Sequence, residues 1–238
     1  MVSGGGTGIG RASAAWFAEQ GDEIWIVGRR AAILAVAAAE IGPQVHTIAA
    51  DLRTPVGAHQ VADTLAGRTV DVVVAGAGGT AAATPTALAD VAAVWQQDME
   101  LNLMTAVLLV AALRESLARP GGRVIGLGSI GAQLGSGYGG SYGAAKAALH
   151  AWMYWLAAEL GPDGITANLV LPGYVPDTEF FGERMNHEFD RVRVARTLVG
   201  RAGTSHDVAA TIGFLASADA GFITGQLIGV TGGAVLGR

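Results

Sequence analysis

The sequence predicts an α/β fold in which one doubly wound parallel sheet is flanked by helices, and three observations support this. Short apolar segments alternate with longer alanine-rich segments of helical character, as strands alternate with crossover helices. Of the 238 residues, 51% are hydrophobic and 15% are charged, which suits strands buried on both faces. A glycine cluster follows the first apolar residues, where a strand would turn into a helix. We expect one domain over residues 1–238.

The first strand of this sheet is unusually short, because only Met1 and Val2 precede Ser3 and the glycines. Two interpretations are open. Either the natural start of the chain lies upstream, or the fold accommodates a clipped central strand.

The glycine cluster is the first candidate binding element. Gly4, Gly8 and Gly10 lack a Cβ, so backbone N–H groups and the start of a helix expected over 11–20 can approach a pyrophosphate closely. The spacing Gly-x-x-x-Gly-x-Gly differs from the commoner Gly-x-Gly-x-x-Gly. A dinucleotide-binding, Rossmann-type sheet is favoured, and a simple tight turn is the alternative.

The second strand, expected over 23–27, is followed by Gly28, Arg29 and Arg30. In sheets of this kind the end of the second strand reaches the adenosine ribose of the cofactor. An acidic residue there accepts hydrogen bonds from the 2′-hydroxyl of NAD, whereas an arginine pairs with the 2′-phosphate of NADP. The two arginines favour NADP, with NAD as the second candidate and a solvated helix start as the alternative interpretation.

The next segments continue the alternation of helix and strand. Helices are expected over 31–41 and 54–66, and strands over 45–49 and 70–75. Ligands of parallel sheets bind beyond the carboxyl ends of the strands. Asp51 and Leu52 are therefore candidate contacts for the adenine, and Gly76 is a candidate cofactor contact after the fourth strand.

Two polar residues near the middle of the chain lie in apolar surroundings. A long helix is expected over 88–118, with Asn102 inside its apolar stretch. A buried amide without partners costs about 1 to 3 kcal/mol, so Asn102 has a structural or a functional role. A strand over 123–127 follows, and Ser129 lies just after it, on the edge of the sheet expected to bind ligands.

Tyr142 and Lys146 are the strongest candidates for chemistry. They lie four residues apart in a segment expected to be helical to residue 160, so both side chains leave the same face. A free tyrosine has a pKa near ~10, and a neighbouring ammonium favours the phenolate. We expect a general acid/base of lowered pKa, although such a pair is also common on helix surfaces.

The glycine loop, Asn102, Ser129 and Tyr142-x-x-x-Lys146 together resemble the classical short-chain dehydrogenase/reductase family. The tail is similar to further motifs of that family at 168–173, 200–203, 207–209, 224–226 and 232–233. The resemblance covers essentially the whole chain. It implies that Tyr142 is the catalytic acid/base and that Lys146 lowers its pKa. Ser129 would bind the substrate oxygen, and Asn102 would hold a water that relays protons toward Lys146.

The same resemblance implies the cofactor contacts. Val175 would contact the nicotinamide carboxamide, and Thr178 a phosphate or the amide. The full set is Gly4, Thr7, Gly8, Ile9, Gly10, Arg29, Arg30, Asp51, Leu52, Gly76, Tyr142, Lys146, Pro172, Gly173, Val175 and Thr178.

Two further features concern regions around this site. Ala75 and Gly76 stand where the family commonly has two asparagines, whose amides support neighbouring strands and loops and whose hydrogen bonds they cannot replace. Residues 174–199 resemble the family's substrate lid, and an amphipathic core helix is the alternative for this segment.

The predicted function is hydride transfer between NADP(H) and a ketone or secondary alcohol, as in 3-oxoacyl-thioester reductases or related alcohol dehydrogenases. The alternative is a catalytically silent dinucleotide-binding sensor or scaffold. The family implies a homo-oligomer, either a tetramer or a dimer. Scattered histidines argue against a metal site. A net charge of −5 without basic runs argues against nucleic acid or membrane as a partner, and the absence of cysteine and of a signal-like segment favours the cytoplasm.

Overall fold

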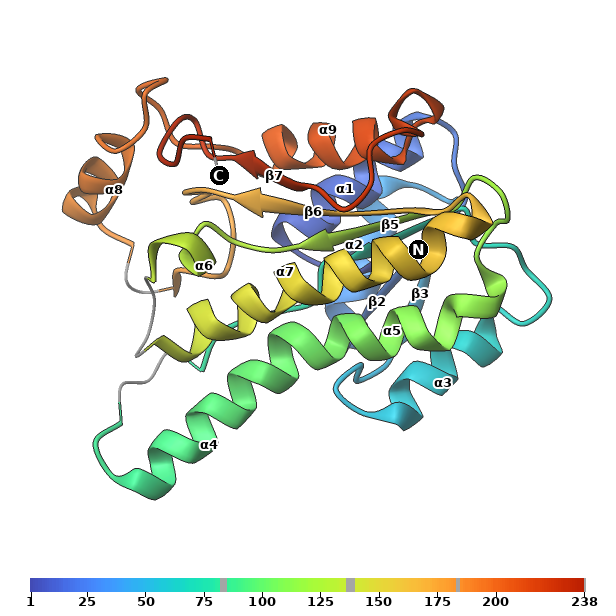
Figure 1. The fold of residues 1–238 in the computed structure, drawn as a ribbon, viewed down its shortest axis with the longest axis horizontal. Coiled ribbons are helices and arrows are strands. Elements are labelled where there is room, and N and C mark those ends of the chain that lie inside the picture. Colours follow the sequence, from blue (N-terminus) through green and yellow to red (C-terminus); the bar gives the residue numbers. More distant parts are fainter. Residues whose placement is uncertain (82–84, 136–139, 183–184, 238) are drawn as a thin grey trace.

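The computed structural model describes residues 1–81, 85–135, 140–182 and 185–237. Residues 136–139 of the loop before Tyr142 and residues 183 and 184 of the predicted lid lie outside the described residues. The described strands form one parallel sheet in the order β3-β2-β1-β4-β5-β6-β7 (Figure 1). They are β1 (Val2–Ser3), β2 (Ile24–Gly28), β3 (Val45–Ala49), β4 (Val72–Ala75), β5 (Arg123–Leu127), β6 (Thr166–Pro172) and β7 (Leu227–Val230).

This sheet confirms the predicted doubly wound fold. The strand order runs outward in one direction from β1 through β2 to β3, and in the other from β4 to β7. The order in which successive strands are added to the sheet therefore reverses its direction between β1 and β4. In parallel sheets a crevice opens at such a point, beyond the carboxyl ends of the strands.

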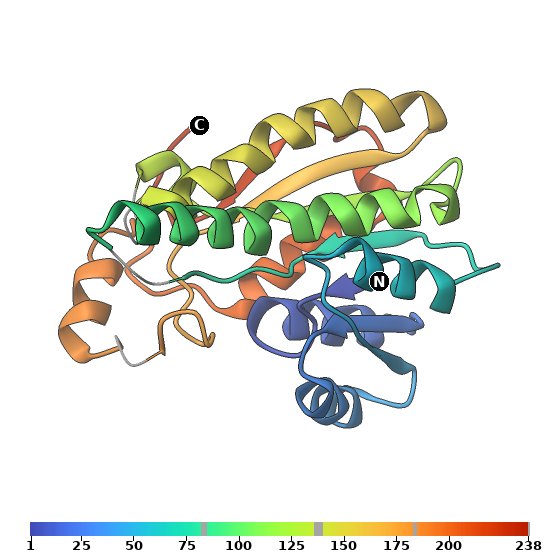
Figure 2. The same cartoon turned by 90° about the horizontal axis from the view of Figure 1, so that it is seen from below.

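Helices cover both faces of the sheet. They are α1 (Gly8–Glu19), α2 (Ala31–Ile41), α3 (Pro55–Thr64), α4 (Leu88–Met99), α5 (Thr105–Leu113), α6 (Gly131–Leu134), α7 (Ser141–Leu160), α8 (His187–Val194) and α9 (Ser205–Ala216). One core contains Phe17 of α1 and Ile212 of α9, and a second contains Leu109 of α5 and Met153 of α7. On the second face, α4 lies alongside α7 in both views (Figures 1 and 2). No helix within the described ranges is long and apolar enough to cross a membrane.

The short β1 occupies the centre of the sheet. Val2 and Ser3 pair with β2 on one side and with β4 on the other, and both are buried. The Ser3 hydroxyl accepts hydrogen bonds from the backbone N–H groups of Gly76 and Ala77, each at 3.1 Å. Part of the support that the two missing asparagines would give to the loop after β4 thus comes from the neighbouring strand.

The long helix predicted over 88–118 changes its winding at Asn102. Between α4 and α5 the backbone forms a π-helical turn, η1 (Glu100–Met104), and Asn102 lies at its centre. A π-helical turn widens the helix locally and is frequent at functional sites. It directs the Asn102 side chain out of the regular helical stripe and toward the loop after β4.

The predicted lid contains α8, and none of the residues of α8 is buried. In this structure α8 is therefore not a core helix, and the role of residues 174–199 as a lid stays a prediction. Figure 1 shows α8 standing apart from the sheet, on the side toward which β5 and β6 point.

Candidate active site

A cleft of about 860 Å³ opens at the carboxyl ends of the strands. Asn102, Ser129, Tyr142 and Lys146 all line it, although they come from four separate points of the chain. The cleft volume lies in the range that small-molecule sites occupy. Most of the candidate cofactor contacts line the same cleft: Gly4, Thr7, Gly8, Ile9, Gly10, Arg29, Arg30, Gly76, Pro172, Gly173, Val175 and Thr178.

Two candidate adenine contacts do not line the cleft. The Leu52 side chain is buried in the core. The Nε of Arg53 donates to both carboxylate oxygens of Asp51, at 2.9 Å to Oδ1 and 3.0 Å to Oδ2. These hydrogen bonds lower the pKa of Asp51. Contact of these two residues with an adenine stays a prediction.

The glycine loop brings the start of α1 close to β1. A Cβ on Gly10 would lie 2.2 Å from the carbonyl oxygen of Gly4, and Gly4 itself has a φ of +70°. No other residue type fits at Gly10 without moving the backbone. The N-cap residue Thr7 makes no side-chain cap, and the first turn of α1 contains no acidic residue. The free N–H groups and the positive end of the helix dipole therefore suit an anion such as a pyrophosphate.

Asn102 is fully buried and its amide is satisfied. Its Nδ2 donates to the carbonyl oxygens of Gly79 and Asp98, both at 2.9 Å, and its Oδ1 accepts from the N–H of Gly79 at 3.2 Å. A Cβ on Gly78 would lie 2.8 Å from Asn102 Oδ1 and 3.2 Å from Lys146 Nζ. The amide oxygen and the amine thus converge on the same side of Gly78.

Tyr142 and Lys146 point inward from the first turns of α7, where they are 8% and 5% exposed. A hydrogen bond joins the Tyr142 phenol to Ser129, and Lys146 Nζ donates to the carbonyl oxygen of Leu127 at 2.8 Å. Lys146 Nζ lies 6.0 Å from the centroid of the tyrosine ring. The predicted placement of Tyr142 and Lys146 on one face of a helix is present, and Ser129 meets the phenol from the loop after β5.

The expected lowering of the Tyr142 pKa is wrong for this structure. Burial raises the pKa of the phenol to about 12, although the hydrogen bond to Ser129 acts in the opposite direction. Burial also lowers the pKa of Lys146 to about 8. Spacing on a helix places the two groups together, but the loss of water around both disfavours each charged form. The phenol is therefore protonated at neutral pH.

Asp98 is a buried residue that the sequence patterns did not single out. Its side chain is 0% exposed. It accepts hydrogen bonds from the N–H of Ala81 at 2.8 Å and from the Ser141 hydroxyl at 2.6 Å. The available signal was its spacing, because Asp98 lies four residues before Asn102 and thus on the same helical face.

Aromatic side chains of the lid segment lie over Tyr142. The Phe180 ring is 5.2 Å from the Tyr142 ring, and Phe181 packs edge-to-face on Phe180 at 5.1 Å. The Arg193 guanidinium lies 3.2 Å from the centroid of the Phe189 ring. All of these side chains line the cleft, so this segment contributes an aromatic cluster and one guanidinium to the site.

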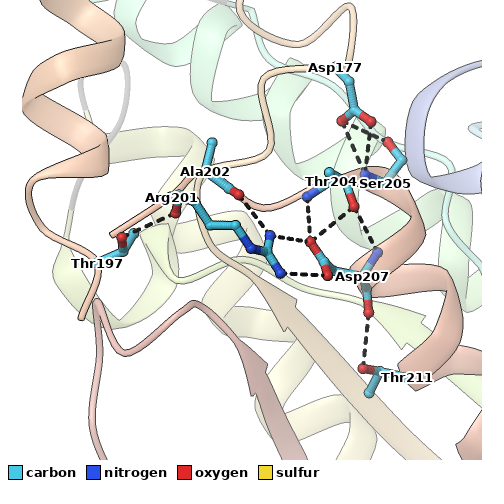
Figure 3. Close-up of polar contacts among 8 residues, drawn as sticks. All are labelled: Asp177, Thr197, Arg201, Ala202, Thr204, Ser205, Asp207 and Thr211. Atoms are coloured by element: carbon cyan, nitrogen blue, oxygen red, sulfur yellow. Dashed lines mark hydrogen bonds and ion pairs between the residues drawn. The ribbon is translucent and has the colours of Figure 1, made fainter. Parts of the chain in front are cut away.

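The two ends of this lid segment are both held at the start of α9 (Figure 3). The Asp177 carboxylate accepts from the backbone N–H of Ser205 at 2.9 Å and from its hydroxyl at 3.0 Å. At the other end, the Thr197 hydroxyl donates to the carbonyl oxygen of Arg201 at 3.1 Å, and the Arg201 guanidinium binds Asp207 of α9. Asp207 also forms a capping box with Thr204, and the hydrogen bonds from Arg201 hold its pKa well below its usual range.

A parallel doubly wound sheet, a glycine turn at its switch point and a group formed by the half-buried Ser129 and the buried Tyr142 and Lys146 define an NAD(P)-dependent oxidoreductase. The chain belongs to the short-chain dehydrogenase/reductase family. A family model described as enoyl-(acyl carrier protein) reductase matches residues 4–235.

Relatives and solved structures agree with this assignment. The short-chain reductase protein NovJ of Streptomyces niveus is 32% identical over 98% of this chain and 92% of its own length. Galactitol 2-dehydrogenase (L-tagatose-forming) of Cereibacter sphaeroides is also 32% identical, over 98% of this chain and 92% of its own. The crystal structure of a short-chain dehydrogenase/reductase from Brucella melitensis matches with a TM-score of 0.90 and 28% identity, covering 99% of this chain and 95% of that one. The Pseudomonas aeruginosa RhlG/NADP active-site complex matches with a TM-score of 0.87 and 29% identity, covering 98% and 94%.

Proposed function

We propose that this enzyme interconverts a ketone and a secondary alcohol with NADP(H) as the hydride carrier. The observation that carries the proposal is the convergence of Ser129, Tyr142 and Lys146 in one cleft, whose other end is lined by the glycine loop and two arginines. A phenol and a hydroxyl at one point suit a substrate oxygen that must gain or lose a proton.

The bound cofactor would supply or accept the hydride through its nicotinamide ring. Ser129 would donate a hydrogen bond to the substrate oxygen, and Tyr142 would transfer the proton to it during reduction. The raised pKa of Tyr142 supports this direction, because the phenol then holds its proton at neutral pH. Lys146, with a pKa near 8, would exchange protons with solvent on the side where Asn102 faces Gly78.

Cofactor preference rests on the end of β2. Gly28 offers no carboxylate for a ribose 2′-hydroxyl, and the exposed Arg29 lines the cleft beside it. Arg30 lines the cleft as well and pairs with Glu179 of the lid at 2.7 Å. Two guanidinium groups at this place suit a 2′-phosphate, so NADP is favoured and NAD is the second candidate.

The substrate class follows from the wall of the cleft near Tyr142. Ile130 and Leu134 line it from one side, and Phe180 and Phe181 from the lid. Such a wall suits a ketone with an apolar body better than a sugar alcohol. Among relatives, 3-oxoacyl-[acyl-carrier-protein] reductase FabG of Vibrio cholerae is 34% identical over 58% of this chain. We propose a 3-oxoacyl thioester or a related apolar ketone.

The proposal also includes the organisation of the protein. We infer one catalytic domain with residues 174–199 as its substrate lid, a homotetramer or homodimer in solution, and a cytoplasmic location. Light scattering coupled to size exclusion would give the mass of the assembly.

Turnover tests the function directly. Purified protein should oxidise NADPH faster than NADH in the presence of at least one ketone from a panel of 3-oxo esters, 3-oxoacyl thioesters and simple ketones. The competing hypothesis is a sensor or scaffold that binds a dinucleotide without turnover. Binding of NADPH with no consumption across the whole panel would favour that hypothesis.

A further inference from the structure

Asp98 is hydrogen-bonded to three parts of the proposed active site. Its carboxylate accepts from Ala81, in the loop after β4, and from Ser141, which directly precedes Tyr142. Its backbone carbonyl accepts from the Asn102 amide at 2.9 Å. A carboxylate that is 0% exposed is costly to bury, so its surroundings must stabilise it.

The start of α7 supplies part of that stabilisation. Its N-cap residue is Gly140, which has no side chain to cap the helix, and the first turn of α7 contains no acidic residue. The dipole of a helix favours a negative charge at its N-terminus. Asp98 on α4 supplies this negative charge. Its carboxylate accepts a hydrogen bond from the Ser141 hydroxyl at 2.6 Å. Tyr142 is the next residue of that first turn.

We propose that Asp98 is a positioning residue for the reaction proposed above: through Ser141 it fixes the first turn of α7, and it places a negative charge beside the residue that directly precedes Tyr142. This inference rests on the proposed function, because it concerns how the acid/base of that reaction is held.

The groups around the phenol support a specific role for this charge. Among the described side chains, Lys146 on α7 lies 6.0 Å from the phenol ring and Asp98 on α4 acts on the phenol through its charge, whereas the β5 loop and the lid segment contribute the neutral Ser129 and Phe180. After burial, which is the largest cause, the negative charge of Asp98 acts to raise the pKa of Tyr142. Asp98 thus opposes the positive helix terminus and Lys146, both of which would favour the phenolate.

The test uses the Asp98→Asn variant of the full chain. The asparagine keeps the shape of the side chain and can accept from Ala81 N–H while donating to the Ser141 oxygen, so it removes mainly the charge. Reduction of ethyl 3-oxobutanoate by NADPH is followed against pH, together with the dissociation constant of NADPH. The alkaline fall in kcat, to which loss of the Lys146 proton and then of the Tyr142 proton both contribute, should move down by about half to one pH unit, because a nearby negative charge favours the protonated form of each group. The NADPH dissociation constant should stay within about twofold of the wild type.

A second variant covers the case in which Asp98→Asn does not fold. Ser141→Ala keeps the charge but removes the link to α7. Its kcat should fall about tenfold or more with unchanged NADPH affinity, because small misplacements of a catalytic group slow the chemical step, while the alkaline fall stays in place. Asp90→Asn, an exposed carboxylate on the same helix, is the matched control and should behave as the wild type.

The outcomes separate the two proposals. An active wild type together with an unmoved alkaline fall in Asp98→Asn overturns the inference alone. If that variant does not fold, a wild-type kcat in Ser141→Ala overturns it, and a reduced kcat with intact NADPH binding supports it. A wild type that reduces none of the ketones in the panel overturns the proposed function, and the inference with it.

Discussion

The two walls of the cleft are built in opposite ways. On the wall formed by α4, η1 and α7, the polar side chains are almost completely withdrawn from water: Asp98, Asn102, Ser141, Tyr142 and Lys146 are at most 8% exposed. On the wall that includes the proposed lid, residues 174–199, α8 has no buried residue, and Glu179 pairs with Arg30 of the β2–α2 loop while each side chain is more than half exposed.

This difference makes the first wall rigid and leaves the second wall able to adapt to a ligand. Buried hydrogen bonds on the first wall hold the phenol, the amine and the amide in one arrangement, at a cost in stability for each polar group withdrawn from water. Exposed ion pairs on the second wall contribute little to the stability of the fold, and salt screens them. The first wall is therefore suited to chemistry, and the second to admitting ligands of different shape. Substitutions on the first wall should have large effects, and those on the second should have graded ones.

The largest effect is expected for Tyr142→Phe on the buried wall. The variant loses the group that transfers the proton but keeps the ring that packs on Phe180. We expect kcat to fall about 10²- to 10⁴-fold, with NADPH affinity nearly unchanged. Steady-state kinetics and fluorescence titration of NADPH measure the two quantities. Tyr154→Phe is the matched control, because Tyr154 lies on the same helix with half of its surface exposed. A fully active Tyr142→Phe would contradict the proposed mechanism.

Lys146→Met should separate stability from activity on the same wall. Burial holds the pKa of Lys146 near 8, below its ordinary value of 10.5. Between these two values the unfolded chain binds a proton that the folded chain does not. The cost of burying Lys146 is therefore complete below pH 8 and disappears as the pH rises toward 10.5. At neutral pH the variant should be inactive and more stable by up to about 3 kcal/mol.

Denaturant unfolding at several pH values measures this gain. It should shrink steadily through the alkaline range, and a gain independent of pH would count against the lowered pKa. Lys146 is the only lysine in the sequence, which otherwise uses arginine for its basic side chains. Arginine does not deprotonate in proteins, whereas a buried lysine does, so this position has a chemical reason to differ. Isotope-labelled methylation of this single side chain would allow its pKa to be followed by NMR.

Arg29→Ala should have an intermediate effect at the edge of the cleft. A charge-assisted pair with a 2′-phosphate contributes about 1.5 to 3 kcal/mol, so NADPH should bind roughly 10- to 100-fold more weakly. NADH, which lacks the phosphate, should be nearly unaffected. Calorimetric titration of both cofactors gives the comparison, with Arg68→Ala as a control outside the cleft. Equal losses for both cofactors would remove the argument for NADP.

The smallest effect is expected for Glu179→Gln on the lid. Glu179 pairs with Arg30 at 2.7 Å, and both side chains are exposed. Removing the carboxylate frees Arg30 for the cofactor phosphate. NADPH should bind tighter by no more than about fivefold, since exposed ion pairs contribute about 1 kcal/mol or less. The gain should decrease with added salt. A change as large as that of Arg29→Ala would mean that the lid wall is not the adaptable one.

Local patterns in the sequence were sufficient for most of the fold. The alternation of apolar and alanine-rich segments predicts the strands and helices, and the glycines predict the turn before α1, because these features depend on neighbouring residues. The helical spacing of Tyr142 and Lys146 correctly places both on one face. The π-helical turn at Asn102 was not predicted, since it depends on packing between α4, α5 and the loop after β4.

The sequence by itself determined which chemical groups the protein has. It also determined which of them follow the ends of strands and which lie on one face of a helix. The tertiary structure decided their ionisation and their partners. The pKa of Tyr142 is raised rather than lowered because the phenol is buried, a property that spacing on one helix does not contain. Asp98 meets Ser141 across 43 residues, and Arg30 meets Glu179 across 149 residues. Such contacts arise only when distant segments pack together, so no local pattern in the chain could predict them.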